Sequence, residues 1–483
     1  MDSINPLPLI SRRHLIKLCG LAALARPVYG QSANNTVRLG IIGCGRRSHG
    51  LAAQFLKIKD VSIVALCDPD PAQLDSLVQD LGKKGGNPSG MKKFQDYRKL
   101  LESPDIDAVV VASPNHWHAL HAIHAMQAGK DVYLEKPVTH ELWEGQQLIA
   151  AEEKYGRIIG AGFQSRSDPG TREGIQFVRE GRLGKIESVH VCCFKERDGI
   201  GLRKTPLTPP PAADYNLWLG PAADLPMFRE EFHYDWHWIW NTGNGDIGNQ
   251  TPHEIDIANR VLGDGSLPKK IRSFGGRFGW NDGGETPNLQ VATYELAGVP
   301  VIVEVNNLKL SPTRNHIGAR DGIRIGVVVR CEGGQLRGGL GGMYAVGKDG
   351  KESIKKFPGD GGDGHQENFI HAVRSRRSAD IASRLHTAEH SAAIAHLANL
   401  SYRSGNKASP ASMEEVTNGN PILQAILSDQ ANQLAAWGVT APEYNLGRVI
   451  DFDPATAKVT TPDIEPLLIR RHCRPDFEFP ELG

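Results

Sequence analysis

Two glycines and an aspartate near the start of the chain have the types and spacing of a dinucleotide-binding turn. Gly43 and Gly45 follow the apolar run 37–42, which is typical of a buried parallel strand. Gly43 would permit a tight turn, and Gly45 would leave room for a pyrophosphate at the N-terminus of the next helix. A second apolar run ends just before Asp68, which would accept hydrogen bonds from the adenosine ribose. Asp68 therefore favours NAD over NADP, although Arg46 lies close enough to weaken that preference.

Lys136 and His253 have side chains that could handle the proton of an alcohol. Lys136 follows the apolar run 132–134, which should end at the carboxyl edge of a parallel sheet, where ligands bind. Its ammonium could hold a substrate hydroxyl and ease the loss of its proton. Thr251 and Glu254 have the spacing of a capping box, which places His253 in the first turn of a helix. The helix dipole disfavours imidazolium there and so keeps the neutral form that a general base needs.

Residues 232–240 alternate between aromatic and polar side chains. The aromatic members are Phe232, Tyr234, Trp236, Trp238 and Trp240. An extended segment would place these rings on one face, where they could stack on the C–H faces of a sugar. The same pattern is typical of a core strand or a subunit contact. Substrate contacts are predicted for Trp236, Trp238, Trp240, His237 and Asp256, and Asp256 could instead orient His253 or belong to a structural network.

Further cofactor contacts are predicted where other strands of the parallel sheet end. The apolar run 109–112 precedes Ser113, Asn115 and His118, which should lie near the nicotinamide. Glu135 occupies the equivalent position after the next strand, directly before Lys136.

The elements that must position these residues fall into two architectures that join near residue 160. Up to that point strands alternate with helices, which predicts a Rossmann domain with a parallel, doubly wound sheet. Beyond it, strand-like segments separated by turn signals predict an α+β domain with an open, mainly antiparallel sheet. The predicted strands are 186–194, 270–276, 289–296, 300–305 and 323–329, and the predicted helices are 367–374, 386–402 and 422–437. The predicted parts are a signal segment at 1–33, a Rossmann domain at 34–160, a second domain at 161–404 and an extension at 405–483 that packs on it.

Residues 11–17 contain paired arginines, and a short apolar run and small residues follow them. This pattern is similar to a twin-arginine export signal, and the run is too short to span a bilayer of about 30 Å as a helix. The alternative is a disordered basic tail. A signal of this kind predicts a periplasmic or otherwise exported protein that uses the twin-arginine translocase, folds before export and does not insert stably in the membrane.

The composition sets limits on partners and metals. The 55 Lys and Arg residues balance the 55 Asp and Glu residues, so nothing favours nucleic acid as a partner. The seven cysteines show no paired framework and no zinc spacing, and no metal site is predicted.

Three stretches resemble the glucose–fructose oxidoreductase, inositol dehydrogenase and rhizopine-catabolism (Gfo/Idh/MocA) family: VRLGIIGCG, ASPNHWHALHAIHAMQAGKDVYLEKP and GNGDIGNQTPHEIDIANRVLG. The resemblance implies NAD or NADP as cofactor, a sugar, inositol or polyol as substrate, a catalytic Lys136 and a cis bond to Pro137. Members often carry Asp four residues before the histidine, where this chain has Asn249. Asn249 can orient a hydroxyl but cannot take its proton, so the role of base would fall on His253, with Lys136 as a second candidate.

These observations favour an exported oxidoreductase that oxidises a secondary hydroxyl of a sugar, glycoside or polyol with tightly bound NAD. The first alternative is a glycoside hydrolase that oxidises its substrate only transiently, with no net redox change. The second is a non-catalytic NAD-binding regulator, against which the export signal and the intact Lys136 and His253 argue. An open sheet face and a long tail also predict a homo-oligomer.

Overall fold

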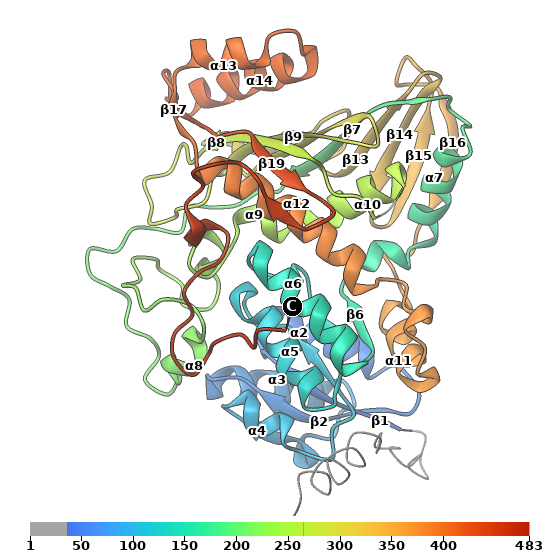
Figure 1. The fold of residues 1–483 in the computed structure, drawn as a ribbon, viewed down its shortest axis with the longest axis vertical. Coiled ribbons are helices and arrows are strands. Elements are labelled where there is room, and N and C mark those ends of the chain that lie inside the picture. Colours follow the sequence, from blue (N-terminus) through green and yellow to red (C-terminus); the bar gives the residue numbers. More distant parts are fainter. Residues whose placement is uncertain (1–35, 264, 483) are drawn as a thin grey trace, which may run out of the picture.

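The computed structural model describes residues 36–263 and 265–482. Figure 1 shows an N-terminal domain and a second domain, each built around its own sheet. The predicted signal at 1–33 lies outside the described residues. The N-terminal sheet has six parallel strands in the order β3-β2-β1-β4-β5-β6, which is the Rossmann order. Its strands are β1 (Val37–Ile42), β2 (Val61–Cys67), β3 (Lys92–Phe94), β4 (Ala108–Val111), β5 (Asp131–Leu134) and β6 (Ile159–Ala161). The helices between them are α2 (Arg46–Phe55), α3 (Pro71–Lys83), α4 (Tyr97–Leu101), α5 (His118–Gln127) and α6 (Leu142–Tyr155).

The second sheet has twelve strands, and its main path runs β16-β15-β14-β13-β7-β10-β9-β8-β18-β17. All its pairs are antiparallel except that between β7 and β10, which confirms the predicted open, mainly antiparallel sheet. Its strands are β7 (Ile186–Phe194), β8 (Lys270–Gly276), β9 (Leu289–Leu296), β10 (Val299–Asn306), β13 (Ile325–Cys331), β14 (Gly334–Gly339), β15 (Gly342–Val346), β16 (Ser353–Pro358), β17 (Asn406–Ala408), β18 (Tyr444–Leu446), β19 (Ile450–Asp453) and β20 (Lys458–Val459). A separate hairpin joins β11 (Lys309–Ser311) and β12 (Arg314–Ile317).

Helices fill the space between the two sheets. They are α7 (Pro169–Arg179), α9 (Gly245–Asn249), α10 (Pro252–Leu262) and α12 (Leu385–Arg403). The first turns of α12 pack Leu385 and Ala392 into the core of the Rossmann domain. Its later turns pack Ile394 and Leu397 into the core under the second sheet. Since burying one such aliphatic side chain contributes roughly 1.5–3 kcal/mol, α12 ties the two cores together.

The chain crosses between the two domains more often than the sequence predicts. Helix α11 (His365–Ser375) lies in the predicted second domain, yet its Phe369 packs against Phe55 and Tyr133 of the Rossmann domain. Helices α13 (Pro410–Thr417) and α14 (Pro421–Ala436) do pack on the second sheet, as predicted for the extension. The prediction is wrong for residues 470–482, which return to α5 and α6 and bury Phe477 and Phe479 there.

Residues 232–240 are also different from the prediction, because they do not form an extended segment. The 3-10 helix η4 (Asp235–Trp238) coils the chain, so the alternating aromatic rings do not share one face. The remaining short helices are η2 (Asn115–Trp117), η3 (Gln164–Arg166), α8 (Tyr215–Leu219) and η5 (Ser378–Asp380), with η1 (Pro88–Gly90) and η6 (Pro466–Leu468). Across the described ranges, no helix combines the length and apolar character needed to cross a bilayer.

Candidate active site

A cavity of about 400 Å³ is lined by both domains. We call one part the glycine end, which is defined by Gly43, Gly45, Arg46 and Asp68. We call the other part the lysine end, which is defined by Lys136, Lys195, Arg197, His237 and Asn249. The first set comes from the turn after β1 and from the end of β2, whereas the second comes from the ends of β5 and β7, from η4 and from α9.

The two glycines of the turn have different physical roles. Gly43 has φ +87°, and a Cβ added there would lie 2.5 Å from the main-chain nitrogen of Ser113. A Cβ added to Gly45 would meet no atom within 4 Å, although Gly45 lines the cavity at the start of α2. Gly43 is therefore required by the fold, whereas Gly45 keeps open a space beside a helix N-terminus that has no side-chain cap. A dinucleotide pyrophosphate fits this arrangement.

Asp68 lies where the sequence places it, at the carboxyl end of β2. Its carboxylate accepts hydrogen bonds from the main-chain N–H groups of Cys44 (2.8 Å) and Asp70 (2.9 Å). Burial raises the pKa of Asp68 to about 6, and these two donors oppose the shift. The side chain is thus held in place by the turn itself and lines the cavity, as a ribose acceptor must.

Ser113, Asn115 and His118 all line the cavity after β4. The two ring nitrogens of His118 lie 2.6 Å from the Pro137 carbonyl oxygen and 2.7 Å from that of Ser113. His118 therefore joins the loop after β4 to the peptide that follows Lys136. Its observed role is to position these two segments.

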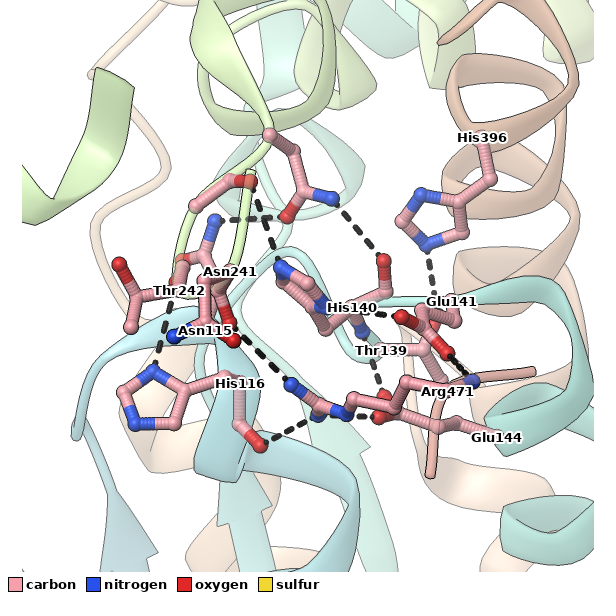
Figure 2. A network of polar contacts seen from close by, with 12 residues as sticks. Asn115, His116, Thr139, His140, Glu141, Glu144, Asn241, Thr242, His396 and Arg471 are labelled. Carbon is pink, nitrogen blue, oxygen red and sulfur yellow. Dashed lines mark hydrogen bonds and ion pairs between the residues drawn. The ribbon is translucent and has the colours of Figure 1, made fainter. Parts of the chain in front are cut away.

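Asn115 belongs to a buried polar network that Figure 2 shows. Its amide donates to Asn244 Oδ1 (3.1 Å). In the same network, Arg471 from the C-terminal segment donates to the carbonyl oxygen of His116 (3.0 Å) and to Glu144 (2.7 Å). The loop that carries Asn115 is thus held by two parts of the chain, around Asn244 and Arg471, that lie far apart in sequence.

Lys136 is the centre of the lysine end. Its Nζ donates to the main-chain oxygen of Asn249 (2.7 Å) and lies 3.4 Å from the side-chain oxygen of the same residue. The bond from Lys136 to Pro137 is cis, as the family resemblance implies. Burial lowers the pKa of Lys136 to about 8, with Glu135 opposing the shift and Lys195 adding to it.

Glu135 lines the cavity but is already engaged. It is buried and accepts a 2.6 Å ion pair from Arg47, which follows Arg46 in the first turn of α2. Burial works against its ionisation, but the Arg47 guanidinium holds the pKa of Glu135 below its usual value. The pair places a neutralised charge beside Lys136.

Two histidines near Lys136 differ in access. His237 lines the cavity, and its Nδ1 lies 2.5 Å from the Tyr234 carbonyl oxygen, to which it must donate. Burial lowers the pKa of His237 to about 3, so the ring is neutral and its Nε2 is an acceptor. His253 lies in the first turn of α10 as predicted, edge-on to Phe163 (5.4 Å), but is not among the residues that line the cavity. Burial and then Lys136 lower its pKa.

Several predicted residues lie elsewhere. Trp236 lines the cavity, but Trp238 and Trp240 do not, because η4 turns them away toward Arg197 and Arg403. Asp256 is buried in a 2.6 Å ion pair with Arg166 and neither lines the cavity nor orients His253.

The predicted capping box is wrong as well. The Thr251 hydroxyl does not cap α10 but donates to the Asp246 carbonyl oxygen (2.7 Å), because the chain enters α10 directly from α9.

Sequence reasoning missed Lys195 and Arg197. Lys195 donates to Gln250 Oε1 (2.5 Å), and Arg197 forms an ion pair with Asp246 (2.8 Å). Both residues directly follow β7, so two basic residues at the end of an apolar run were the available signal. Tyr234 also lines the cavity and accepts from Arg197 at 2.8 Å.

The fold and cavity define an α/β protein with an NAD-binding Rossmann domain, and comparison with known families agrees. Residues 37–163 match the Gfo/Idh/MocA model, described as the oxidoreductase family with NAD-binding Rossmann fold. The match confirms the prediction of NAD as the cofactor of this domain.

Curated relatives match only part of the chain. A glycosyl hydrolase family 109 protein of Shewanella pealeana is 31% identical over 172 residues, which cover 30% of this chain and 37% of the relative. A 1-carboxy-3-chloro-3,4-dihydroxycyclohexa-1,5-diene dehydrogenase of Comamonas testosteroni is 24% identical over 242 residues, covering 50% and 51%. The chain thus spans about a third to a half of the length of these curated relatives.

Solved structures align with about three quarters of this chain. The WlbA dehydrogenase of Bordetella pertussis, in complex with NADH and UDP-GlcNAcA, aligns with a TM-score of 0.53 at 19% identity, covering 74% of this chain and 94% of that one. An oxidoreductase of Agrobacterium radiobacter, in complex with NAD+, L-tartaric acid and magnesium, aligns with a TM-score of 0.52 at 14% identity, covering 75% and 95%. At these identities the likeness concerns the fold alone.

Proposed function

We propose that this protein oxidises a secondary hydroxyl of a sugar, glycoside or polyol with NAD bound in the cavity. One observation carries the proposal. A glycine turn and acidic residue of the dinucleotide type share a single cavity with Lys136, a partly buried lysine whose pKa of about 8 suits proton transfer near neutral pH. The dehydrogenases with the same fold support this reading.

We assign the role of proton acceptor to Lys136 and not to His253. His253 does not line the cavity, and the pKa of His237 is too low for efficient proton capture. The neutral amine of Lys136 accepts the hydroxyl proton while Asn249 and the Nε2 of His237 orient the substrate. When bound, NAD supplies the nicotinamide that accepts the hydride. The residues that would hold it are those of the glycine end, together with Ser113 and Asn115.

The test is reduction of the nicotinamide in the NAD-loaded protein by a panel of sugars, glycosides and polyols. Lys136→Ala should lose about 10²–10⁴-fold in single-turnover rate, the range typical of a proton-transfer group, while still binding NAD. His253→Ala is the matched comparison and should lose much less. A Lys136→Ala variant with a near-normal rate would contradict the proposal.

The glycosyl hydrolase family 109 relatives favour a second function, hydrolysis of a glycoside through transient oxidation. Lys136 and the glycine end would serve the oxidation step in either function. Product analysis separates the two: a hydrolase releases sugar with no net NADH, whereas an oxidoreductase forms one NADH for each hydroxyl oxidised.

We also propose that the protein is exported by the twin-arginine translocase and carries its NAD with it. The paired arginines, Arg12 and Arg13, support this, as does a cavity lined by both domains. Replacing both arginines by lysine should keep the protein in the cytoplasm. Dinucleotide released by denaturing the exported protein tests the second half of the proposal, and its absence would contradict it.

A further inference from the structure

The lysine end holds more positive than negative charge. Four cationic side chains line it or adjoin it: Arg47, Lys136, Lys195 and Arg197. The two guanidiniums are neutralised in ion pairs, with Glu135 for Arg47 and Asp246 for Arg197. The two ammoniums have neutral partners among the described residues, since Lys136 donates to Asn249 and Lys195 donates to the Gln250 amide.

A third acid close to this pair, Glu254, does not balance it. Glu254 accepts from the other end of the Gln250 amide (3.2 Å), so Gln250 separates it from Lys195. Glu254 is buried, and burial raises its pKa to about 8, which keeps the carboxyl protonated at neutral pH. At the same pH Lys136 remains mainly protonated, because its own pKa is about 8.

The cofactor does not balance it either. A pyrophosphate belongs at the start of α2, where Gly45 leaves space and Arg46 is available. Lys195 lies instead at the end of β7, on the second domain, beside the group that handles the proton.

We infer that the substrate is an acidic sugar or polyol acid, and that Lys195 binds its carboxylate next to the hydroxyl that is oxidised. The inference rests on the proposed function and specifies its substrate class. A carboxylate suits the site better than a phosphate monoester. Both arginines at this end are paired and Lys136 is engaged with the reacting hydroxyl, so Lys195 is left to balance one negative charge and not two. Lys195 lines the cavity and presents a compact point charge to it.

The experiment compares matched ligands on the NAD-loaded protein. D-glucuronate, D-galacturonate and D-gluconate are titrated by calorimetry against their neutral amides, and each is also tested for nicotinamide reduction. At least one acid should bind about 10- to 100-fold more tightly than its amide, as expected for a charge-assisted contact. Lys195→Gln should abolish this difference and Lys195→Arg should keep part of it. Lys351→Gln, on an exposed loop between β15 and β16, is the control and should change nothing.

The outcomes separate the inference from the proposed function. If no acid binds more tightly than its amide to the wild-type protein, the inference is wrong, whatever the Lys195 variants do. Reduction of nicotinamide by a neutral sugar in that case would leave the proposed function intact. Tight, Lys195-dependent binding of an acid without any reduction of nicotinamide would support Lys195 as the carboxylate site, but it would contradict oxidation of that acid and with it the proposed function.

Discussion

The two ends of the cavity are built in opposite ways. The glycine end comes from one continuous β-α-β unit, and main-chain donors satisfy its only buried acid, Asp68. The lysine end collects Lys136, Lys195, His237 and Asn249 from four separate elements, and within the described residues its two ammoniums donate to neutral oxygens. Cofactor binding is thus a local property of the sequence, whereas substrate choice depends on the whole fold. This is why a match confined to residues 37–163 specifies NAD but not the substrate.

The largest expected effect is the loss of NAD affinity in Gly45→Val, which tests the glycine end. Backbone angles at Gly45 suit any residue, and a side chain there would enter only the cavity, so the protein should fold and yet bind NAD at least about 100-fold more weakly. Dinucleotide titration of the apoprotein measures this. Gly50→Val, on the exposed side of the same helix, is the matched control. Wild-type NAD affinity in Gly45→Val would show that the glycine end is not the pyrophosphate site.

The pH dependence of nicotinamide reduction should test the lysine end. The rate of nicotinamide reduction should rise about tenfold per pH unit and level off above about pH 8, because only neutral Lys136 accepts a proton. Lys195→Gln removes a positive neighbour that lowers the pKa of Lys136, so it should move the midpoint to higher pH. Single-turnover rates across this range give the profile, and a flat profile would remove Lys136 from the proton-transfer step.

Lys136 should also affect stability, with a definite sign. Its pKa is lower in the folded chain than the ordinary value of 10.5, so between about pH 8 and that value the unfolded chain binds more protons. Stability from this group therefore rises with pH through this window. Denaturant titrations of the wild type and of Lys136→Met should show that stability rises more steeply with pH through this window in the wild type than in the variant.

The smallest effect should be that of Asp68→Asn. The amide keeps the shape of the side chain but removes the charge that repels a 2′-phosphate, so the preference for NAD over NADP should narrow by about tenfold. Affinities for both dinucleotides measure the ratio. An unchanged ratio would mean that Asp68 does not face the ribose.

Sequence patterns predicted the features that a short stretch of chain determines by itself, such as strands and turns. The bounds of β7, β8 and β9 match the predicted strands, and the glycine turn and Lys136 lie where expected. Residues 232–240 misled because their alternation mimics a strand. In the structure, Asp235 accepts from the Glu231 N–H (2.7 Å) and His237 binds the Tyr234 carbonyl, and these bonds coil the segment.

Contacts between distant residues left no periodic signal. Lys195 contacts Gln250 only because β7 and α9 come together in the folded chain. The sequence around either residue does not predict this contact. The return of residues 470–482 to the Rossmann domain is invisible for the same reason. Phe477 packs edge-on against Trp117 (5.5 Å), two residues beyond Asn115.

That return has a consequence for how the protein is made. On the ribosome the Rossmann domain emerges first, but its core is closed by Phe477 and Phe479, and the loop that carries Asn115 is held by Arg471. A chain whose synthesis stops before residue 470 would therefore expose Trp117 and present an unfinished cofactor cavity, even though every glycine-end residue had already been translated.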